Sequence, residues 1–225
     1  TIGADHQVVL HQPIRISLPD MAQGAEMTSA TPMRLDHAED PDELRAAIDG
    51  AVTIQDPTGA VAIDVGSSTG GFTDVLLTNG AARVYAVDSG TNQLAWKLRQ
   101  DERVIVHEQT SARILTDAHI PEPVDLVVCD ASFIGLAKVL ERPLSFARPG
   151  ARLIALIKPQ FEVGRERVGK GGIVKDPVLH QEVCRRIKTW LDGLTGWRVI
   201  GVTESPIKGA EGNMEFLIAA RYLKA

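Results

Sequence analysis

The stretch AIDVGSSTGGF, residues 62–72, carries the strongest indication of the fold in this chain of 225 residues. It begins as an apolar strand, reaches an acid at Asp64 and continues into a loop of glycine, serine and threonine. Gly66, Gly70 and Gly71 lack side chains that would keep a ligand away from the backbone. Doubly wound sheets bind ligands in such loops, at the carboxyl ends of central strands. The same pattern is also compatible with a plain tight turn from strand to helix.

The rest of the chain from Val61 onward alternates between strand-like and helix-like patterns, which is typical of a parallel sheet with helices on both faces. A helix is predicted over 176–194, where Asp-Pro is followed by apolar residues at helical spacing. The last two strands, 197–205 and 213–222, are too close together for a crossover helix and should pair antiparallel. Earlier strands are predicted, with helices in the gaps, at 61–66, 83–89, 104–109, 124–130 and 151–158. The fold class is therefore α/β, with the Rossmann-like, mostly parallel sheet and antiparallel C-terminal strand of class I methyltransferases.

The spacing of the glycines discriminates among nucleotide ligands. Gly-Ser-Ser-Thr-Gly-Gly does not match the G-x-G-x-x-G of dinucleotide sites, and the sequence has no Gly-Lys-Ser/Thr phosphate loop. A nicotinamide-dependent oxidoreductase is therefore disfavoured. A nucleoside without phosphates fits better, and S-adenosylmethionine is a common one. Its predicted contacts include a ribose-binding carboxylate at the end of the next strand; the full set is Asp64, Gly66, Ser67, Ser68, Thr69, Gly70, Gly71, Phe72, Asp88 and Asp130.

Composition excludes several classes of protein. Apolar residues make up 44% and charged residues 24% of the chain, as in ordinary globular proteins. No apolar run approaches the ~18 residues of a membrane-spanning helix, and no secretory signal is visible, so a cytoplasmic location is expected. Cys129 and Cys184 are predicted to be buried free thiols. His107 and His180 lack metal-ligand spacing, and no metal is predicted.

Charge divides the chain just before Pro57. Residues 1–56 hold ten acids against three arginines and no lysine, a net charge of −7, whereas residues 57–225 hold 19 acids and 21 bases, a net charge of +2. We expect an irregular acidic extension over 1–56, with a short helix at 40–49, followed by one catalytic domain over 57–225. Local charge governs nucleic-acid binding, so the main domain is compatible with RNA while the extension is a poor RNA-binding arm.

Five long motifs together resemble the TlyA family within the FtsJ-like RNA 2′-O-methyltransferases; they lie at 64–77, 84–99, 124–134, 155–177 and 204–217. The resemblance covers roughly residues 60–223. It implies S-adenosylmethionine as cofactor and ribosomal RNA or a ribosomal subunit as partner, with no obligate protein partner evident. Family members are also described as hemolysins, but no amphipathic or spanning segment supports membrane lysis.

The resemblance also implies catalytic residues. A ribose 2′-hydroxyl is almost fully protonated at neutral pH, so a nearby basic group must accept or share its proton. Asp130 ends the fourth predicted strand, Lys158 ends the fifth, and Glu215 lies in the last. Lys158 is expected to activate the hydroxyl while the two acids orient it, because burial can favour the neutral form of a lysine. Taken singly, Lys158 could instead extend to water, Asp130 could cap a helix and Glu215 could be a solvated acid on an edge strand.

Two departures from the family pattern affect the expected activity. The family carries an S4-type RNA-binding domain before the methyltransferase domain, and residues 1–56 resemble none of it. Glu43 aligns with the lysine that opens the catalytic set in the family's Arg-Gly-Gly-x-Lys-Leu stretch. The chain is therefore expected to bind cofactor well and to methylate RNA poorly. The resemblance as a whole still predicts an enzyme that uses S-adenosylmethionine to methylate ribose 2′-hydroxyls of ribosomal RNA. The alternative, for which Glu43 is the evidence, is a module that binds S-adenosylmethionine or RNA without efficient turnover.

The glycine-rich segment 159–177 is the predicted contact with RNA, since its cations could meet phosphates and its glycines would let it close over a substrate. An ordinary solvated loop remains the alternative. The cations are Arg165, Arg167, Lys170 and Lys175. Phe133 and Phe161 could stack on a base, although core packing is the preferred interpretation for both.

Overall fold

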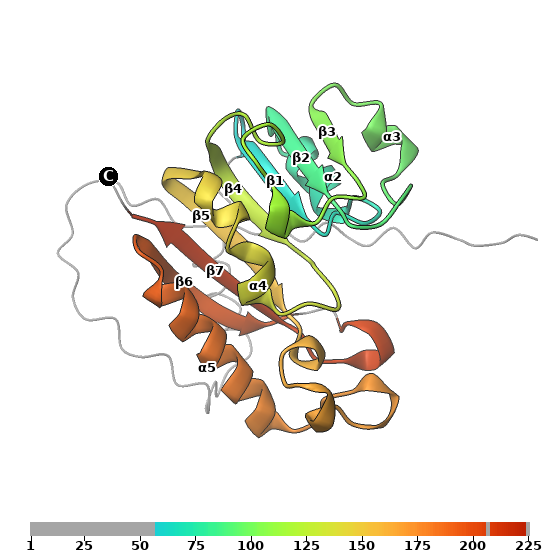
Figure 1. Cartoon of the computed structure of the whole chain (residues 1–225), viewed down its shortest axis with the longest axis vertical. Helices are drawn as coiled ribbons and strands as arrows, with labels where there is room; N and C mark the ends of the chain where they lie inside the picture. The colour runs from blue at the N-terminus through green and yellow to red at the C-terminus, as the bar shows by residue number, and fades with distance from the viewer. Residues whose placement is uncertain (1–56, 206–207, 224–225) are drawn as a thin grey trace, which may run out of the picture.

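The computed structural model describes residues 57–205 and 208–223, which form a single seven-stranded sheet with helices on both faces (Figure 1). The strands are β1 (Val61–Val65), β2 (Arg83–Val87), β3 (Val104–His107), β4 (Val124–Cys129), β5 (Ala147–Ile157), β6 (Trp197–Glu204) and β7 (Phe216–Tyr222). The helices are α2 (Gly71–Thr78), α3 (Trp96–Arg99), α4 (Leu136–Leu140) and α5 (Pro177–Gly193). The short 3₁₀ turns that bear on the site are η1 (Ala112–Ile114), η3 (Pro159–Phe161), η4 (Arg165–Arg167), η5 (Lys170–Gly172) and η6 (Ala210–Gly212).

The strand order β3-β2-β1-β4-β5-β7-β6 confirms the predicted fold class. Strands β1 to β5 pair in parallel, and β7 is inserted antiparallel between β5 and β6. Because β7 runs in the opposite direction, its first residue lies at the edge where β4 and β5 end. Phe216 pairs with Ile157 at this edge.

Three details of the sequence prediction were wrong. Glu215 precedes the last strand, which begins at Phe216, rather than lying in it. The β5 strand begins at Ala147, before the predicted start at 151, because the chain already pairs with β4 there. Among the described residues, only the 3₁₀ turn η1 lies between β3 and β4, where a helix was expected.

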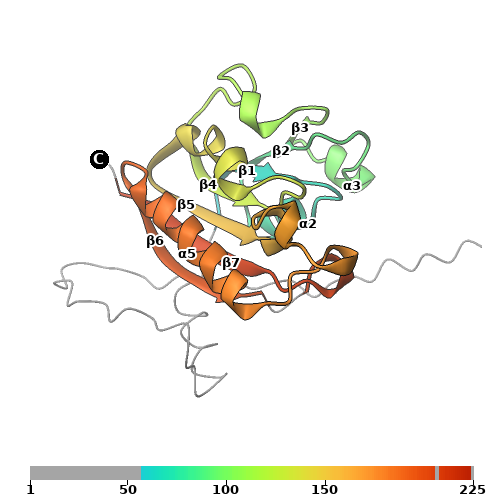
Figure 2. The same cartoon turned by 60° about the horizontal axis from the view of Figure 1, so that its bottom comes forward.

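Two apolar layers hold the helices to the sheet, as Figures 1 and 2 show from two directions. Helices α2 and α3 pack on one face through Leu76, Leu77 and Leu98. Helices α4 and α5 pack on the other, where the buried residues of α5 include Val183, Ile187 and Leu191. The spacing of these residues keeps one side of α5 against the strands.

Helix α5 begins as its sequence predicts. Pro177 occupies its first turn, and the Asp176 side chain accepts a hydrogen bond of 2.9 Å from the Val178 backbone N–H. This arrangement satisfies one of the free backbone donors of a helix start. Cys129 and Cys184 are buried free thiols, as predicted, and burial raises the pKa of each to about 12.

Several predictions lie outside the described residues, namely those for the extension 1–56, its helix at 40–49 and Glu43. No helix of residues 57–205 and 208–223 combines the length and the hydrophobicity needed to cross a bilayer.

Candidate active site

The glycine loop joins β1 to α2 in a conformation that its sequence permits. Gly66 and Gly70 have φ of 76° and 98°, in the left-handed region that favours glycine. A Cβ at Gly66 would lie 2.9 Å from the Cα of Ala131, so the loop and the segment after β4 approach closely. A Cβ at Gly71 would meet nothing within 4 Å, so space is open beside the start of α2.

Asp64 is a charged group placed in the core beneath this loop. It is 1% exposed, and one carboxylate oxygen accepts hydrogen bonds from the backbone N–H of Thr73 (3.0 Å) and its hydroxyl (2.6 Å). The other oxygen, Oδ1, is buried and has no hydrogen-bond partner among the described residues. The same is true of the Oγ of Ser67. Burial raises the pKa of Asp64 to about 7, and Asp130 and Asp88 add smaller repulsions. Two buried polar atoms beside the loop are thus left for a ligand to pair with.

Asp88 follows β2 and meets the same loop. Its carboxylate accepts a hydrogen bond of 2.9 Å from the Ser68 backbone N–H and one of 2.6 Å from that of Gly90. The next segment is ordered by Glu108, which accepts bonds from the backbone N–H groups of residues 92–94 and pairs with Arg99. The Arg99 guanidinium, with these amides, lowers the pKa of Glu108 to about 2. The three ends of β1, β2 and β3 therefore form one polar rim.

The remaining predicted contacts of the cofactor line the loop itself. Ser68 and Thr69 are exposed, Phe72 is half-buried, and the Thr69 carbonyl accepts a bond of 3.1 Å from the Ala95 backbone N–H. Asp130 connects this region to the predicted catalytic residues, because its backbone N–H donates to the Val65 carbonyl at 3.0 Å.

The three predicted catalytic residues converge at the carboxyl edge of the sheet. The Nζ of Lys158 lies 2.5 Å from Oδ1 of Asp130 and donates to the Ser132 hydroxyl at 3.1 Å. The Lys158 side chain is only 12% exposed. It is therefore an ion-paired group, and the alternative that it extends freely to water is wrong.

Glu215 completes the cluster from the segment before β7. It is 6% exposed, and Oε1 accepts a hydrogen bond of 3.2 Å from the side-chain amide of Gln160. Burial raises the pKa of Glu215, while the positive charge of Lys158 and the Gln160 bond oppose that rise. The alternative of a solvated acid is therefore wrong. So is that of Asp130 as a helix cap, since α4 begins at Leu136 with Gly135 at the cap position.

The loop 159–177 is pinned to its surroundings. Asn213 accepts a hydrogen bond of 3.0 Å from the Val174 backbone N–H and donates one of 3.0 Å to the Gly172 carbonyl. A ring nitrogen of His180 lies 2.8 Å from the Val174 carbonyl oxygen. Glu162 accepts a bond of 2.6 Å from the Leu136 N–H and pairs with Arg186 at 2.9 Å.

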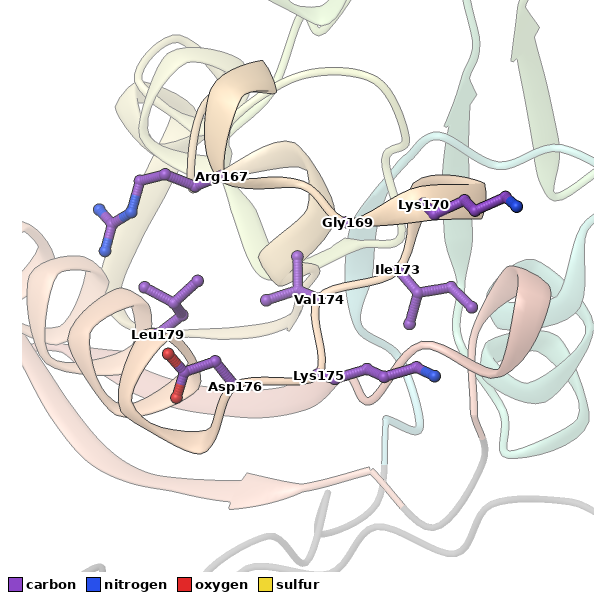
Figure 3. A pocket seen from close by; sticks show the side chains of 8 residues that line it. All are labelled: Arg167, Gly169, Lys170, Ile173, Val174, Lys175, Asp176 and Leu179. Carbon is purple, nitrogen blue, oxygen red and sulfur yellow. The ribbon is translucent and has the colours of Figure 1, made fainter.

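The four predicted RNA-binding cations of this loop are all exposed, but they differ in their partners. Arg167 forms two bonds to the Glu182 carboxylate, at 2.8 and 2.5 Å, so its charge is compensated. An open pocket of about 340 Å³ lies between the two arms of the loop. In Figure 3, Lys170 and Lys175 extend to one side of this pocket, and Arg167 and Asp176 lie at the other. The lysines and Arg165 are thus better placed than Arg167 to meet an anion.

Phe133 corrects another sequence prediction. It is 90% exposed and adopts a φ of 66°, so it does not pack in the core. A bulky residue is uncommon in this left-handed conformation, which suggests a functional constraint. Its ring centroid lies 5.0 Å from that of half-buried Phe161. Phe133 directly follows Ser132 in the chain, and the Phe161 backbone N–H donates to the Lys158 carbonyl at 2.9 Å.

Three residues in the site were not predicted from the sequence: Thr73, Ser132 and Gln160. Each contacts a predicted residue, respectively Asp64, Lys158 and Glu215. Their polar side chains within the glycine-loop, DASF and KPQF motifs were the available signal. Nε2 of His107 lies 2.9 Å from the carbonyl oxygen of His119.

Comparison with known proteins gives consistent matches. Residues 45–222 match the model of the FtsJ-like methyltransferases. The chain is 50% identical over 159 residues to YqxC of Bacillus subtilis, provisionally named an rRNA methyltransferase, covering 70% of this chain and 56% of that one. It is 48% identical over 163 residues to TlyA of Mycobacterium tuberculosis, a 16S/23S rRNA (cytidine-2′-O)-methyltransferase, covering 72% and 60%. A crystal structure of a provisionally named hemolysin from Lactococcus lactis matches with a TM-score of 0.72 and 43% identity, covering 80% and 84%.

Proposed function

This chain belongs to the FtsJ-like methyltransferase family, and from that membership we propose that it methylates a ribose 2′-hydroxyl of ribosomal RNA with S-adenosylmethionine. The observation that carries the proposal is the ion pair of Lys158 and Asp130 beside the glycine loop, with Glu215 next to it. Groups able to act as acid and base, next to a loop suited to a nucleoside, support the proposal.

The residues at this edge fit S-adenosylmethionine. Oδ1 of Asp64 and Oγ of Ser67, buried without partners in the described part of the chain, can accept and donate bonds to the amino acid end of the ligand. Asp88, already at the end of β2, can accept bonds from ribose hydroxyls. When bound, S-adenosylmethionine supplies a methyl group on a positively charged sulfur.

The catalytic cluster can activate the acceptor. On accepting that methyl group the 2′-hydroxyl would lose its proton, and the residues of the chain would supply the base that takes it up. Lys158 is the group we assign to that hydroxyl, and Asp130 holds its Nζ at 2.5 Å. Glu215 adds a second negative charge that stabilises the ammonium form after proton transfer.

The RNA would approach across the loop 159–177 and Phe133. Arg165, Lys170 and Lys175 can pair with phosphates, and Phe133 presents an exposed ring on which a base can stack. A ribosomal substrate also implies a cytoplasmic location. The chain spans less than two thirds of the length of the curated relatives, 56% and 60%. Methylation of a cytidine, named for the mycobacterial relative, is the finer proposal.

The test is transfer of a radiolabelled methyl group to ribosomal RNA, followed by mapping of the modified nucleotide. We expect label on a ribose 2′-oxygen, and loss of about 10²–10⁴ in rate for Lys158→Ala, as for removal of a positioned acid–base group. Lys138→Ala, which changes an exposed lysine of α4, is the matched control. Labelling that is equal in the two variants would contradict the assigned role.

A second candidate rests on Glu43, which stands where the family has its first catalytic lysine. In this case the chain binds cofactor but turns over slowly. A chimera with an Arg-Gly-Gly-x-Lys-Leu segment in place of residues 39–44 should then exceed the parent in methyl transfer, with unchanged affinity for S-adenosylmethionine. Robust turnover by the parent, abolished by Lys158→Ala, would argue against this candidate.

A further inference from the structure

Gln160 is an amide placed in contact with a carboxylate of the catalytic cluster. It lies in η3, two residues after Lys158, and its Nε2 donates to Oε1 of Glu215 at 3.2 Å. Its other polar atom, Oε1, is buried and has no partner among the described residues. A buried polar atom without a partner destabilises a fold. An apolar side chain of the same size would avoid this loss, so stability does not explain the glutamine.

Backbone also approaches Glu215 closely, at the same oxygen. A Cβ added at Gly209 would lie 2.0 Å from Oε1 of Glu215, so the loop before β7 closes directly on the carboxylate. The Gly209 N–H donates to the Asn213 carbonyl at 2.9 Å, which fixes that loop. The charged groups that act on Glu215 are Lys158 from the end of β5 and Asp130 from the end of β4. The positive charge of Lys158 favours the ionised form of Glu215, and the negative charge of Asp130 disfavours it.

We propose that Gln160 is a positioning residue that keeps the Glu215 carboxylate ionised and turned toward Lys158. The amide N–H donates to the charged form and stabilises it against burial and against Asp130. The amide oxygen cannot replace it, because two acceptors would then face each other. The expected change in rate rests on the proposed methyl transfer. The effect of Gln160 on the ionisation of Glu215 does not depend on that proposal.

The sign of the kinetic effect follows from the contact. The Gln160 bond lowers the pKa of Glu215, so its removal raises that pKa further. At acidic pH more of the variant enzyme then carries a protonated, inactive Glu215. At alkaline pH the parent and the variant both carry the carboxylate, and their rates converge. A merely structural role would lower the rate by a similar factor at every pH.

The kinetic experiment compares the parent with Gln160→Met, Gln160→Glu and Gln181→Met in methyl transfer to ribosomal RNA between pH 6 and 9. Methionine keeps the size and removes the donor, glutamate adds a like charge, and Gln181 is an exposed residue of α5. We expect Gln160→Met to be about threefold to tenfold slower at pH 6 and to approach the parent at pH 9, in the range of one charge-assisted hydrogen bond. The glutamate variant should shift further, and the Gln181 control should follow the parent.

A second measurement needs no turnover. The carboxyl carbon of Glu215 is titrated by NMR in glutamate-labelled protein, with Glu215→Gln to assign the signal and thermal unfolding to check that each variant is folded. We expect a higher midpoint in Gln160→Met than in the parent and in Gln181→Met. An unchanged midpoint, or a uniform loss of rate at all pH values, overturns the role of Gln160. A parent that transfers no methyl group overturns the proposed function instead, and the titration still decides about Gln160.

Discussion

At the scale of single residues, the site contains groups that would be unfavourable in a core selected for stability alone. Asp64 is buried, and one of its oxygens has no partner among the described residues; Glu215 is also buried, and the charge of Asp130 disfavours its ionisation. Burying a carboxylate opposes its ionisation, which makes such positions frequent at functional sites. Phe133 shows the opposite arrangement, because its apolar ring is exposed to solvent. We propose one explanation for the unfavourable placement of these three side chains, namely that each meets a ligand.

The buried carboxyl group of Asp64 should make the free energy of unfolding depend on pH. Its pKa rises from 3.8 to about 7 in the folded protein, so between those values the folded state holds a proton that the unfolded state has released. The free energy of unfolding should therefore fall as pH rises from about 4 to 7, by at most on the order of 4 kcal/mol. Urea unfolding of the parent and of Asp64→Asn at pH 5 and 8 isolates this contribution from other groups. A difference between the two proteins that stays constant with pH would contradict it.

A substitution at Phe133 should weaken RNA binding without lowering the stability of the fold. Phe133→Gly removes an exposed ring and relieves the left-handed backbone, so the folded protein should be as stable as the parent or up to about 1 kcal/mol more stable. Loss of base stacking should weaken RNA binding by about 1–3 kcal/mol. Thermal unfolding and binding to ribosomal RNA measure the two effects. RNA affinity equal to that of the parent would remove Phe133 from the interface.

At the scale of elements, the loop 159–177 is a shaped surface with anchors at Glu162, Arg167 and Val174. Its glycines permit the turns, and its anchors fix the two arms around the pocket of Figure 3. The cations therefore divide into an anchor, Arg167, and three residues without a carboxylate partner in the described part of the chain, Arg165, Lys170 and Lys175. This division could not be read from the sequence, in which all the cations looked alike.

Because Arg167 anchors the loop and the two lysines do not, neutralising Arg167 should have a different effect from neutralising Lys170 and Lys175. Lys170→Gln with Lys175→Gln should reduce the slope of log affinity for RNA against log salt by about 1–2 and leave thermal stability unchanged. Arg167→Gln should act mainly by loosening the loop from α5, which lowers the melting temperature. Filter binding at several salt concentrations and thermal unfolding distinguish the two. An unchanged slope in the double variant would make the lysines part of a solvated surface only.

At the scale of the whole molecule, the sheet brings distant segments to one edge. The ends of β1, β2, β4 and β5 meet there because these strands are parallel, and the segment before β7 joins them because β7 is antiparallel. The residues predicted to bind the cofactor and the predicted catalytic residues thus share a single rim. A ligand at this rim contacts most strands of the sheet, so its binding should stabilise the domain as a unit.

Ligand binding therefore predicts a shift of the melting temperature. S-adenosylmethionine at about 100 times its dissociation constant adds about 2.7 kcal/mol, or about 5–11 °C for a domain of this size. NAD should leave the melting temperature unchanged, since the loop lacks the dinucleotide spacing. Differential scanning fluorimetry with each ligand makes the comparison. A shift with NAD alone would support an oxidoreductase instead.

The sequence by itself determined the order of the strands and of most helices, the glycine loop and the identity of the three residues next to the strand ends. These features are local, because periodicity, caps and glycine spacing act within a few residues. Asp130 and Lys158 could be expected together because the carboxyl ends of parallel strands share one edge. The two free buried cysteines also followed from composition and spacing alone.

Only the tertiary structure decided which of these side chains are paired, buried or exposed. The Gln160 contact with Glu215 joins residues 55 positions apart, and the Arg167 pair with Glu182 joins a loop to a helix. Phe133 has an apolar side chain, yet its exposure depends on the turn that follows β4. Such outcomes depend on packing between segments that are remote in the chain, and hydrophobic pattern carries no information about them.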